Sequence, residues 1–323
     1  PHPVLGVYFQ GKRPVYRILF NDGSVVEADK EHLWTVRAQR GKRRHTIKTT
    51  KLKPGQYIPA IKPVEFAASS VPVDAYLLGA LLGDGCLGKE SIKFSSADPF
   101  ILEQVQKLLP PELTLKKVKG KNYDFGISRK SLFGKRGNPL MKKLKDLGLH
   151  NAKSHQKFIP ECYLYNNLET RVAMLQGLCD TDGSPSRAYA VDYVTISKQL
   201  AEDIRELVLS LSGKCTISLK HTHYEYKGKR RSGKLAYRLY ISLPSEIVPF
   251  RLTRKLKAYS GKSKYNETPR RIISVDYDRE ENTQCILVDV PDHLYITDGY
   301  ILTHNTVGIA MSACTWAALT ADF

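Results

Sequence analysis

The sequence predicts a β-rich domain that is interrupted by a larger α+β domain made of two related halves. An order of helix, strand, helix and strands occurs twice, beginning at YLLGALLGDG (76–85) and at MLQGLCDTDG (174–183). Near the end of the chain, HLYITDGYILTHNT (293–306) has the pattern of strand, turn and strand, reversing at Thr297-Asp298-Gly299. At 323 residues the chain is also long enough for two or more domains.

The β-rich domain is expected to be discontinuous. Segments 1–70 and 251–305 would form it together, and segment 71–250 would be the inserted α+β domain, with halves at about 71–150 and 160–250. After Thr306 the chain continues as VGIAMSACTWAALTADF (307–323), a small-residue apolar run of helical type, so 306–323 is expected to be a flanking piece of another protein. The chain opens PHPVLGVYFQ without Met, and we expect it to begin inside the β-rich domain.

The formal net charge is +18, and its placement is uneven. Residues 1–70 hold 13 Lys or Arg against 5 Asp or Glu, residues 71–250 hold 28 against 18, and residues 251–323 hold 9 against 9. Basic surface in the first two segments indicates a polyanion partner, most simply nucleic acid. From charge alone, a solvated lysine-rich face is an equal alternative.

Cysteine usage and hydropathy exclude several protein classes. The six cysteines are scattered without a CxxC pair, so the sequence favours neither a disulfide framework nor a zinc site, and reduced thiols fit a cytoplasmic protein. No apolar run is long enough to span a bilayer, and the polar, proline-interrupted start is not a signal peptide. We therefore expect no membrane association.

Small residues in the two repeated segments predict a close helix pair. In the first copy Gly79 and Gly83 lie four residues apart, and in the second copy Gly177 and Thr181 match them. Small residues at this spacing let two helix backbones approach closely. Gly85 and Gly183 are expected to end the helices in a left-handed conformation.

Each predicted helix ends in an acid, Asp84 in the first copy and Asp182 in the second. Two packed helices would bring these carboxylates together at the negative helix ends, where they repel each other. A divalent cation relieves this repulsion, and oxygen ligands with open positions suit Mg²⁺. Such ions can activate water and stabilise the leaving oxygen of a phosphodiester.

The nonapeptides LLGALLGDG and LQGLCDTDG resemble the two copies of the LAGLIDADG motif of homing endonucleases, and the resemblance covers about residues 71–250. It implies a monomer whose saddle-shaped β-sheets lie on double-stranded DNA, with Asp84 and Asp182 binding the catalytic metal. KFIP (157–160) resembles the family's K-x-I-P block, which makes Lys157 a candidate for the basic residue that assists cleavage. The second copy is the closer match, since Leu82 and Gly83 replace Asp-Ala in the first.

The flanks resemble the splicing domain of an intein, which has the Hedgehog/intein (HINT) fold and often carries such an endonuclease. DGSVVEADKEHLWTV (22–36) resembles the N-terminal block with a functional histidine, here His32. CILVDVPDHLYITDGYILTHNT (285–306) resembles the C-terminal blocks, which assign an inner histidine to His293 and place His304, Asn305 and the downstream residue Thr306 at the junction.

The chemistry of a splice junction explains these residue types. An Asn305 side-chain amide held against its own carbonyl can cyclise to a succinimide and cut the peptide bond after it without water. A neighbouring imidazole, from His304 or His293, can protonate the leaving amine. Thr306 offers a hydroxyl nucleophile.

The upstream junction needs a second nucleophile, normally the first residue of the intein, and Pro1 cannot act as one. Trp34, Cys285 and Thr303 resemble the Trp-Cys-Thr signature of class 3 inteins, in which the internal cysteine attacks the upstream junction directly. The thioester would then pass from Cys285 to Thr306. A standard intein whose first-residue nucleophile lies upstream of this chain is the alternative.

Two further expectations concern partners. An insertion just before Thr306 could fall in the Thr of a phosphate-binding Gly-Lys-Thr loop, so the host in cis is expected to be a bacterial or phage ATPase, such as a terminase or a replicative helicase. A DNA-binding protein that kept the duplicated scaffold and lost catalysis is the rival function, and Leu82-Gly83 favours it.

Overall fold

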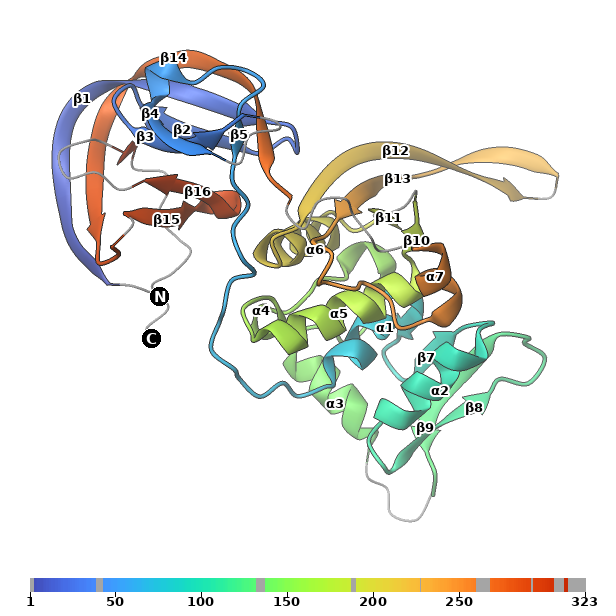
Figure 1. The fold of residues 1–323 in the computed structure, drawn as a ribbon. Coiled ribbons are helices and arrows are strands. Elements are labelled where there is room, and N and C mark those ends of the chain that lie inside the picture. Colours follow the sequence, from blue (N-terminus) through green and yellow to red (C-terminus); the bar gives the residue numbers. More distant parts are fainter. Residues whose placement is uncertain are drawn as a thin grey trace. The chain divides into compact units, whose positions relative to one another are not determined.

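The structure is a computed structural model that describes residues 3–38, 43–131, 137–186, 190–226, 228–259, 268–291, 293–304 and 311–312. The chain divides into two compact units (Figure 1). The terminal unit comprises Pro1–Lys62 and Glu267–Phe323, and the central unit comprises Pro63–Asn266. Each unit has an apolar core of its own.

The boundaries of these units differ from the predicted ones, 70/71 and 250/251. Residues 63–70 belong to the central unit because Val64 N donates to Ser210 O, and the buried Arg171 guanidinium donates to the carbonyl oxygen of Val64. Residues 251–266 belong there as well, since Arg251 and the residues after it are anchored on the second repeated helix. Polar contacts that tie a linker to a neighbouring domain leave no periodic pattern in the sequence.

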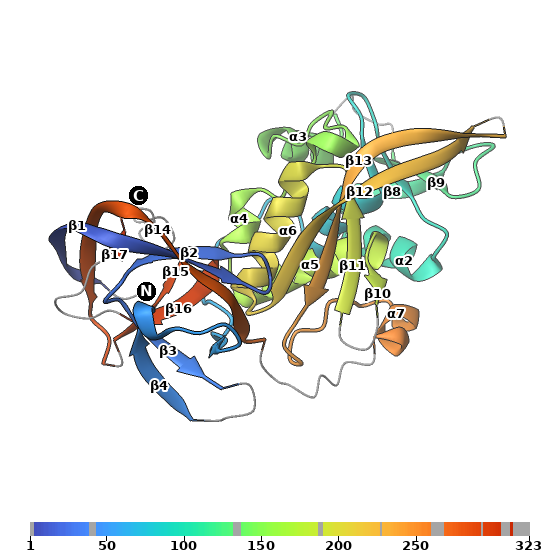
Figure 2. The same cartoon turned by 90° about the horizontal axis from the view of Figure 1, so that it is seen from above.

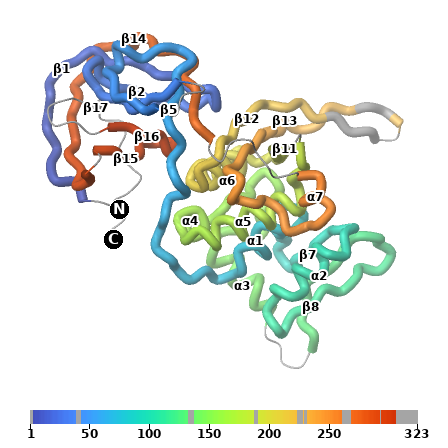
Figure 3. Tube along the Cα trace, in the orientation of Figure 1, coloured from blue at the N-terminus to red at the C-terminus, as the bar shows by residue number. Residues whose placement is uncertain are grey.

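The terminal unit is built on a long antiparallel pair of strands from opposite ends of the chain. β1 (Val4–Phe20) pairs with β14 (Arg270–Val288), from Val4 opposite Val288 to Phe20 opposite Ile272, and the two strands run side by side in Figure 3. They belong to a seven-stranded sheet of order β2-β1-β14-β5-β3-β4, with β17 also paired to β14. The other strands are β2 (Val25–Asp29), β3 (Leu33–Arg37), β4 (Arg44–Lys48), β5 (Tyr57–Ile58) and β17 (Met311–Ser312), and a short 3-10 helix, η1, spans Thr49–Lys51.

Both terminal segments contribute to one apolar core in this unit. Its buried members are Ile18, Phe20, Val26, Ala28, Trp34, Val36, Leu52, Ile58, Ile272 and Ile301. β5 and β14 are neighbours, with Ile58 opposite Arg270. The chain therefore passes into the central unit shortly after β5 and comes back into the terminal unit shortly before β14. The flank after residue 305 was predicted to be helical, but its two described residues form strand β17.

The hairpin predicted near the end of the chain is confirmed. β15 (Leu294–Thr297) pairs with β16 (Ile301–His304), with Thr297 opposite Ile301. The connection is a 3-10 turn, Asp298–Tyr300, in which Gly299 has φ 68°. A residue without a Cβ adopts this left-handed conformation at little cost.

The central unit confirms the predicted repeat. Each half runs helix, two strands, helix, two strands, helix. Each half has one four-stranded sheet, and the two sheets have matching strand orders, β6-β7-β9-β8 and β10-β11-β13-β12. The first half holds α1 (Ala75–Asp84), β6 (Gly85–Leu87), β7 (Ile92–Ser95), α2 (Pro99–Leu108), β8 (Leu113–Lys117), β9 (Asp124–Arg129) and α3 (Pro139–Asp146). The second holds α5 (Leu168–Thr181), β10 (Ser184–Pro185), β11 (Ala190–Thr195), α6 (Lys198–Ser210), β12 (Lys214–Tyr226), β13 (Lys229–Ser242) and α7 (Thr253–Ala258). η2 (Ser154–Gln156) and α4 (Glu161–Leu164) join the halves.

α1 and α5 cross in direct backbone contact, as their small residues predict. A Cβ added to Gly79 would overlap the carbonyl oxygen of Met174 and lie 3.0 Å from Leu178 N. A Cβ added to Gly177 would overlap the carbonyl oxygen of Tyr76 and lie 2.8 Å from Ala80 N. Every residue of α1 from Ala75 to Leu82 is buried, so the crossing forms the centre of this unit's core.

Replacing Gly177 with alanine is expected to destabilise the central unit by about 3 kcal/mol, because the obstructing atoms belong to the backbone of α1 and the helices must move apart. The melting temperature of this unit should fall by roughly 6–12 °C. Calorimetry of the full chain measures this, with Gly137→Ala as the matched control, since a Cβ at Gly137 meets nothing within 4 Å. Equal melting temperatures for the two variants would show that the crossing is not tight.

The prediction that Gly85 and Gly183 end their helices in the left-handed region is wrong. Gly85 is extended, with φ −83° and ψ 140°, and neither glycine has a positive φ. Close approach requires these glycines instead. A Cβ at Gly85 would lie 2.8 Å from Leu81 Cα, and a Cβ at Gly183 would lie 2.7 Å from Cys179 Cα.

Candidate functional site

The two motif carboxylates lie where the C-terminal ends of α1 and α5 meet. Asp84 is the last residue of α1, and Asp182 is the C-cap of α5. The ends are close because a Cβ added to Gly83 would lie 2.7 Å from Thr181 Cβ and 3.4 Å from Asp182 Oδ2. Asp84 is half-buried, and Asp182 is exposed. The structure thus brings together the two acids that the repeat predicts.

The electrostatics of this carboxylate pair favour a bound cation. Burial, followed by the Asp182 carboxylate, raises the pKa of Asp84 to about 6. The pKa of Asp182 is raised as well, since the protein atoms packed around its carboxylate remove much of its hydration although the residue reaches solvent. Raised pKa values mean that the folded chain disfavours the ionised pair relative to water even with Lys157 and Lys255 nearby, and a bound cation would favour the ionised form.

Lys157, the residue predicted to assist cleavage, lies next to the pair and caps the end of α1. Its Nζ donates to the carbonyl oxygens of Leu81, Leu82, Gly83 and Gly85 at 2.7 to 3.2 Å. An ammonium group at this position neutralises the negative end of the helix and satisfies its last carbonyls. Burial lowers the pKa of Lys157, while Asp182 and Asp84 act in the opposite direction.

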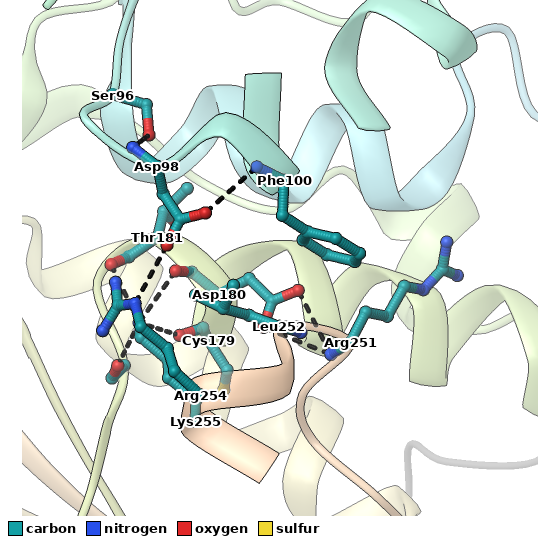
Figure 4. A network of polar contacts seen from close by, with 11 residues as sticks. Ser96, Asp98, Phe100, Cys179, Asp180, Thr181, Arg251, Leu252, Arg254 and Lys255 are labelled. Atoms are coloured by element: carbon teal, nitrogen blue, oxygen red, sulfur yellow. Dashed lines mark hydrogen bonds and ion pairs between the residues drawn. The ribbon is translucent and has the colours of Figure 1, made fainter. Parts of the chain in front are cut away.

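Lys255 is the counterpart of Lys157 in the second half, and it was not among the predicted residues. Its Nζ donates to the carbonyl oxygens of Cys179, Asp180, Thr181 and Gly183 at 2.5 to 3.2 Å (Figure 4). These acceptors occupy the same places at the end of α5 as the acceptors of Lys157 do at the end of α1. The signal was present, because Lys255 follows Asp182 by 73 residues and Lys157 follows Asp84 by 73. The predicted boundary at residue 250 assigned Lys255 to the wrong unit.

The segment around α7 is fixed by a carboxylate that only the second motif has. Asp180, 1% exposed, accepts hydrogen bonds from Tyr76 Oη at 2.8 Å and from the backbone N of Arg251 and of Leu252 at 3.2 and 3.1 Å. Figure 4 shows Asp180 with Arg251 and Leu252 beside Lys255, and Arg254 donates to Asp98 at 2.9 Å. The first motif has Leu82 at the matching place, so the halves differ in how their lysine-bearing segments are held.

The sheets of the central unit present polar and basic side chains on the face turned away from the helices. The exposed residues there include Lys93 and Lys116 in the first half and Lys220 and Arg238 in the second. Arg238 pairs with Asp192 of β11 at 2.9 Å. β12 and β13 continue well past β11 as a two-stranded ribbon, which Figure 2 shows. Such a surface suits a phosphate backbone.

The residues predicted for splicing gather in the terminal unit. His32 Nε2 lies 2.5 Å from Thr303 Oγ1, and both side chains are buried. The ring of Trp34 packs edge-on against His32 at 5.1 Å between centroids, and the rings of His293 and His304 stack at 5.9 Å. Trp34 lies on β3 and His32 just before it, while His293, Thr303 and His304 lie on or next to the β15–β16 hairpin.

Cys285 lies on β14 and is 2% exposed. Burial, and next the Cys285 thiol, raises the pKa of the Tyr295 phenol. Tyr295 stands directly opposite Thr303 in the hairpin. Asn305 and Thr306, the two residues predicted at the junction, lie outside the described residues, which end at His304 on this side.

Burial sets the protonation of His32. It lowers the pKa of His32 to about 3, and His304 adds to this effect, so the His32 ring is neutral at pH 7. Thr49, which sequence reasoning missed, accepts from Trp34 Nε1 at 3.0 Å and donates to the carbonyl oxygen of His32 at 3.3 Å. Nothing in the sequence distinguishes Thr49 from the other threonines of its segment.

Within the described part of the chain, no three His, Cys, Asp or Glu side chains form a metal-binding group. An ion at Asp84 and Asp182 would thus take its remaining oxygen ligands from water or substrate, which is the open coordination that Mg²⁺ tolerates. No described helix is both long and apolar enough to cross a membrane.

Comparisons with known proteins agree with part of this picture. Residues 169–246 match the LAGLIDADG-like domain family. The chain is 27% identical to the replicative DNA helicase DnaB of Mycobacterium intracellulare over 333 aligned residues, 92% of this chain and 51% of that protein. It is 30% identical to the DnaB of Rhodothermus marinus over 218 residues, 62% of this chain and 22% of that protein.

A third relative carries a different name. The chain is 26% identical to a DNA gyrase subunit of Mycobacterium kansasii over 162 residues, 48% of this chain and 29% of that protein. The chain therefore spans about half or less of the length of each of these three relatives.

Proposed function

We propose that this chain is an intein that carries a site-specific DNA endonuclease. One observation carries the proposal: a central unit with a duplicated helix pair and paired carboxylates interrupts a terminal unit whose two segments pair strand by strand along β1 and β14. An element that removes itself from a protein needs both of its ends in one place. The β1–β14 ribbon supports this proposal, since it pairs Val4, near the start of the chain, with Val288.

The endonuclease assignment rests on the carboxylates, the lysines and the basic sheets. Asp84 and Asp182 would hold Mg²⁺, which when bound activates water and stabilises the leaving oxygen of a phosphodiester. Lys157 and Lys255 neutralise the helix ends beside the pair and so keep two carboxylates tolerable there. The exposed sheet faces would bind the phosphate backbone of double-stranded DNA. The match of residues 169–246 to a LAGLIDADG-like domain supports a DNA endonuclease.

The splicing assignment rests on the cluster in the terminal unit. The sulfur of Cys285 would attack the carbonyl at the upstream junction and release the amine of the intein's first residue. The acyl group would pass to the hydroxyl oxygen of Thr306, and cyclisation of Asn305 would then free the intein. The buried, neutral His32 and the stacked His293 and His304 would move protons in these steps.

The relatives support an inserted element more than a domain of one enzyme. This chain resembles parts of proteins named as a helicase and as a component of a gyrase, and it covers only 22–51% of each of these three relatives. An element that enters different genes would give this result. The DnaB relatives also fit a helicase as the host protein in cis, one of the two ATPases expected from the sequence.

Two rival functions keep specific support. A scaffold that binds DNA without cutting it is favoured by Leu82 and Gly83, which depart from the motif in the first half. A standard intein would use a nucleophile at its own first residue in place of Cys285. Substitutions at Asp182 and at Cys285 separate both rivals from the proposal.

Plasmid cleavage tests the endonuclease. Purified full chain with Mg²⁺ is expected to cut a plasmid that carries the host gene without the intein coding segment, at a single site, and EDTA is expected to stop the reaction. Agarose gels distinguish nicked, linear and supercoiled DNA. Tight binding of that site without cutting, in Mg²⁺, would support the DNA-binding rival instead.

A further inference from the structure

The two halves of the central unit differ in one buried aromatic residue beside the motif acids. In the first half Phe94 of β7 pairs with Gly85, the residue after Asp84. In the second half Tyr193 follows Asp192, the partner of Ser184, so it stands level with Gly183, the residue after Asp182. Phe94 is 0% exposed and Tyr193 is 1% exposed, so the two rings fill equivalent places in the core.

The hydroxyl of Tyr193 is not needed for packing. The first half fills the matching place with a phenyl ring that carries no polar atom. The Tyr193 hydroxyl is fully buried and meets no partner in hydrogen-bond geometry among the described residues. A buried hydroxyl without a partner is unfavourable, so this group needs an acceptor.

The candidate acceptor is the carboxylate of Asp182, the residue before Gly183, which stands level with Tyr193. Burial is the largest cause of the raised pKa of Asp182. The Tyr193 hydroxyl lowers this pKa, as a donor that hydrogen-bonds the charged form does. Burial, and next the Asp182 charge, raises the pKa of the Tyr193 phenol far above its ordinary value. A phenol carries its proton at neutral pH and a carboxylate only accepts, so the Tyr193 hydroxyl would be the donor.

We propose that Tyr193 is a positioning residue that holds the Asp182 carboxylate through its hydroxyl, so that the two motif acids are unequal partners. The proposal rests on the proposed endonuclease function, in which Asp84 and Asp182 hold the divalent cation. The two strands of a duplex are related by a two-fold axis, as are the two halves of this unit. The inequality of the acids therefore becomes an inequality between the two strands that are cut.

Two measurements on Tyr193→Phe test the proposal. Calorimetric titration of the full chain with Ca²⁺, used as the probe, is expected to show binding weakened on the order of tenfold, because one hydrogen bond to a charged group is lost. Cleavage of a duplex labelled on one strand at a time should slow on the order of tenfold for one strand, with a much smaller change for the other. The melting temperature should not fall, since Phe fits the matching place in the first half.

Tyr163→Phe is the matched control. The hydroxyl of Tyr163 is also buried, but it donates to Val73 O at 2.7 Å and accepts from Val73 N at 3.1 Å. Its loss is expected to lower the melting temperature and to leave Ca²⁺ affinity and the ratio of strand rates unchanged. A merely structural role for Tyr193 predicts the same behaviour for both variants.

The outcomes separate this inference from the function on which it rests. If the wild-type chain binds Ca²⁺ and cuts DNA, while Tyr193→Phe matches it in affinity and in both strand rates, the positioning role is refuted and the endonuclease stands. If the wild-type chain neither binds Ca²⁺ nor cuts, the proposed function fails first. Equal slowing of both strands with unchanged Ca²⁺ affinity also refutes the inference.

Discussion

Replacing Asp182 with asparagine is expected to reduce DNA cleavage by about 10³-fold or more. The substitution keeps the shape of the side chain and removes the charge that would hold the cation, and metal stabilisation of a phosphodiester transition state is worth several factors of ten. Initial rates of plasmid nicking in Mg²⁺ measure the effect. Asp84→Asn is also expected to reduce cleavage strongly, since Asp84 would hold the cation together with Asp182.

The same variants distinguish lost chemistry from lost folding. The pKa of Asp84 is raised in the folded chain to about 6 from 3.8, so the folded state binds more protons than the unfolded state between these values. The contribution of this acid to stability therefore falls as the pH rises from about 4 to about 6. Neutral asparagine at either position is expected to keep or raise the melting temperature at pH 7.

Asp146→Asn is the control for these variants. Asp146 is exposed at the end of α3, away from the motif helix ends, and its replacement should change neither cleavage nor stability. Undiminished cutting by Asp182→Asn would remove the carboxylate pair from the proposed mechanism. Wild-type DNA binding by a chain that never cuts would favour the rival DNA-binding function.

Replacing Cys285 with alanine is expected to block cleavage at the upstream junction completely. The experiment uses the precursor expressed from its gene, with the native sequence upstream of residue 1 included. A nucleophile that forms the thioester cannot be replaced by a methyl group, so no ligated product and no free upstream flank should form. Gel electrophoresis and mass spectrometry of the products measure this result.

Release of the downstream flank provides the internal reference for that experiment. Cyclisation of Asn305 does not involve the sulfur of Cys285, so slow cleavage after Asn305 should persist in Cys285→Ala. Cys162→Ala, a half-buried cysteine of the central unit, should splice like the wild type. If Cys285→Ala splices normally while the residue at the upstream junction proves indispensable, the chain is a standard intein.

Sequence patterns predicted the parts of the fold that depend on local periodicity. The repeat, the close crossing at Gly79 and Gly177, the hairpin at Thr297-Asp298-Gly299 and the meeting of Asp84 with Asp182 are all confirmed. Each follows from a spacing of a few residues, or from two similar stretches that fold alike. The pairing of sequence copies was therefore sufficient to predict the carboxylate pair.

The parts that sequence patterns missed depend on contacts between distant residues. Lys255 and Thr49 act through backbone carbonyl groups that any sequence provides, and the domain boundaries depend on how Arg171 and Asp180 hold their partners. Gly85 and Gly183 are required for close approach to their own helices, although the same residue type also suits left-handed turns. The glycine pattern alone therefore cannot distinguish a left-handed turn from a close backbone approach.

The neighbouring positions of Ile58 on β5 and Arg270 on β14 have a consequence for the history of such a gene. The chain leaves the terminal unit and returns to it at two neighbouring strands, and each unit has its own core. A coding segment for the central unit can therefore be gained, lost or exchanged like a cassette, with a short linker closing the gap. Under the proposed function, selection on self-excision and selection on DNA cutting could then act separately on one reading frame.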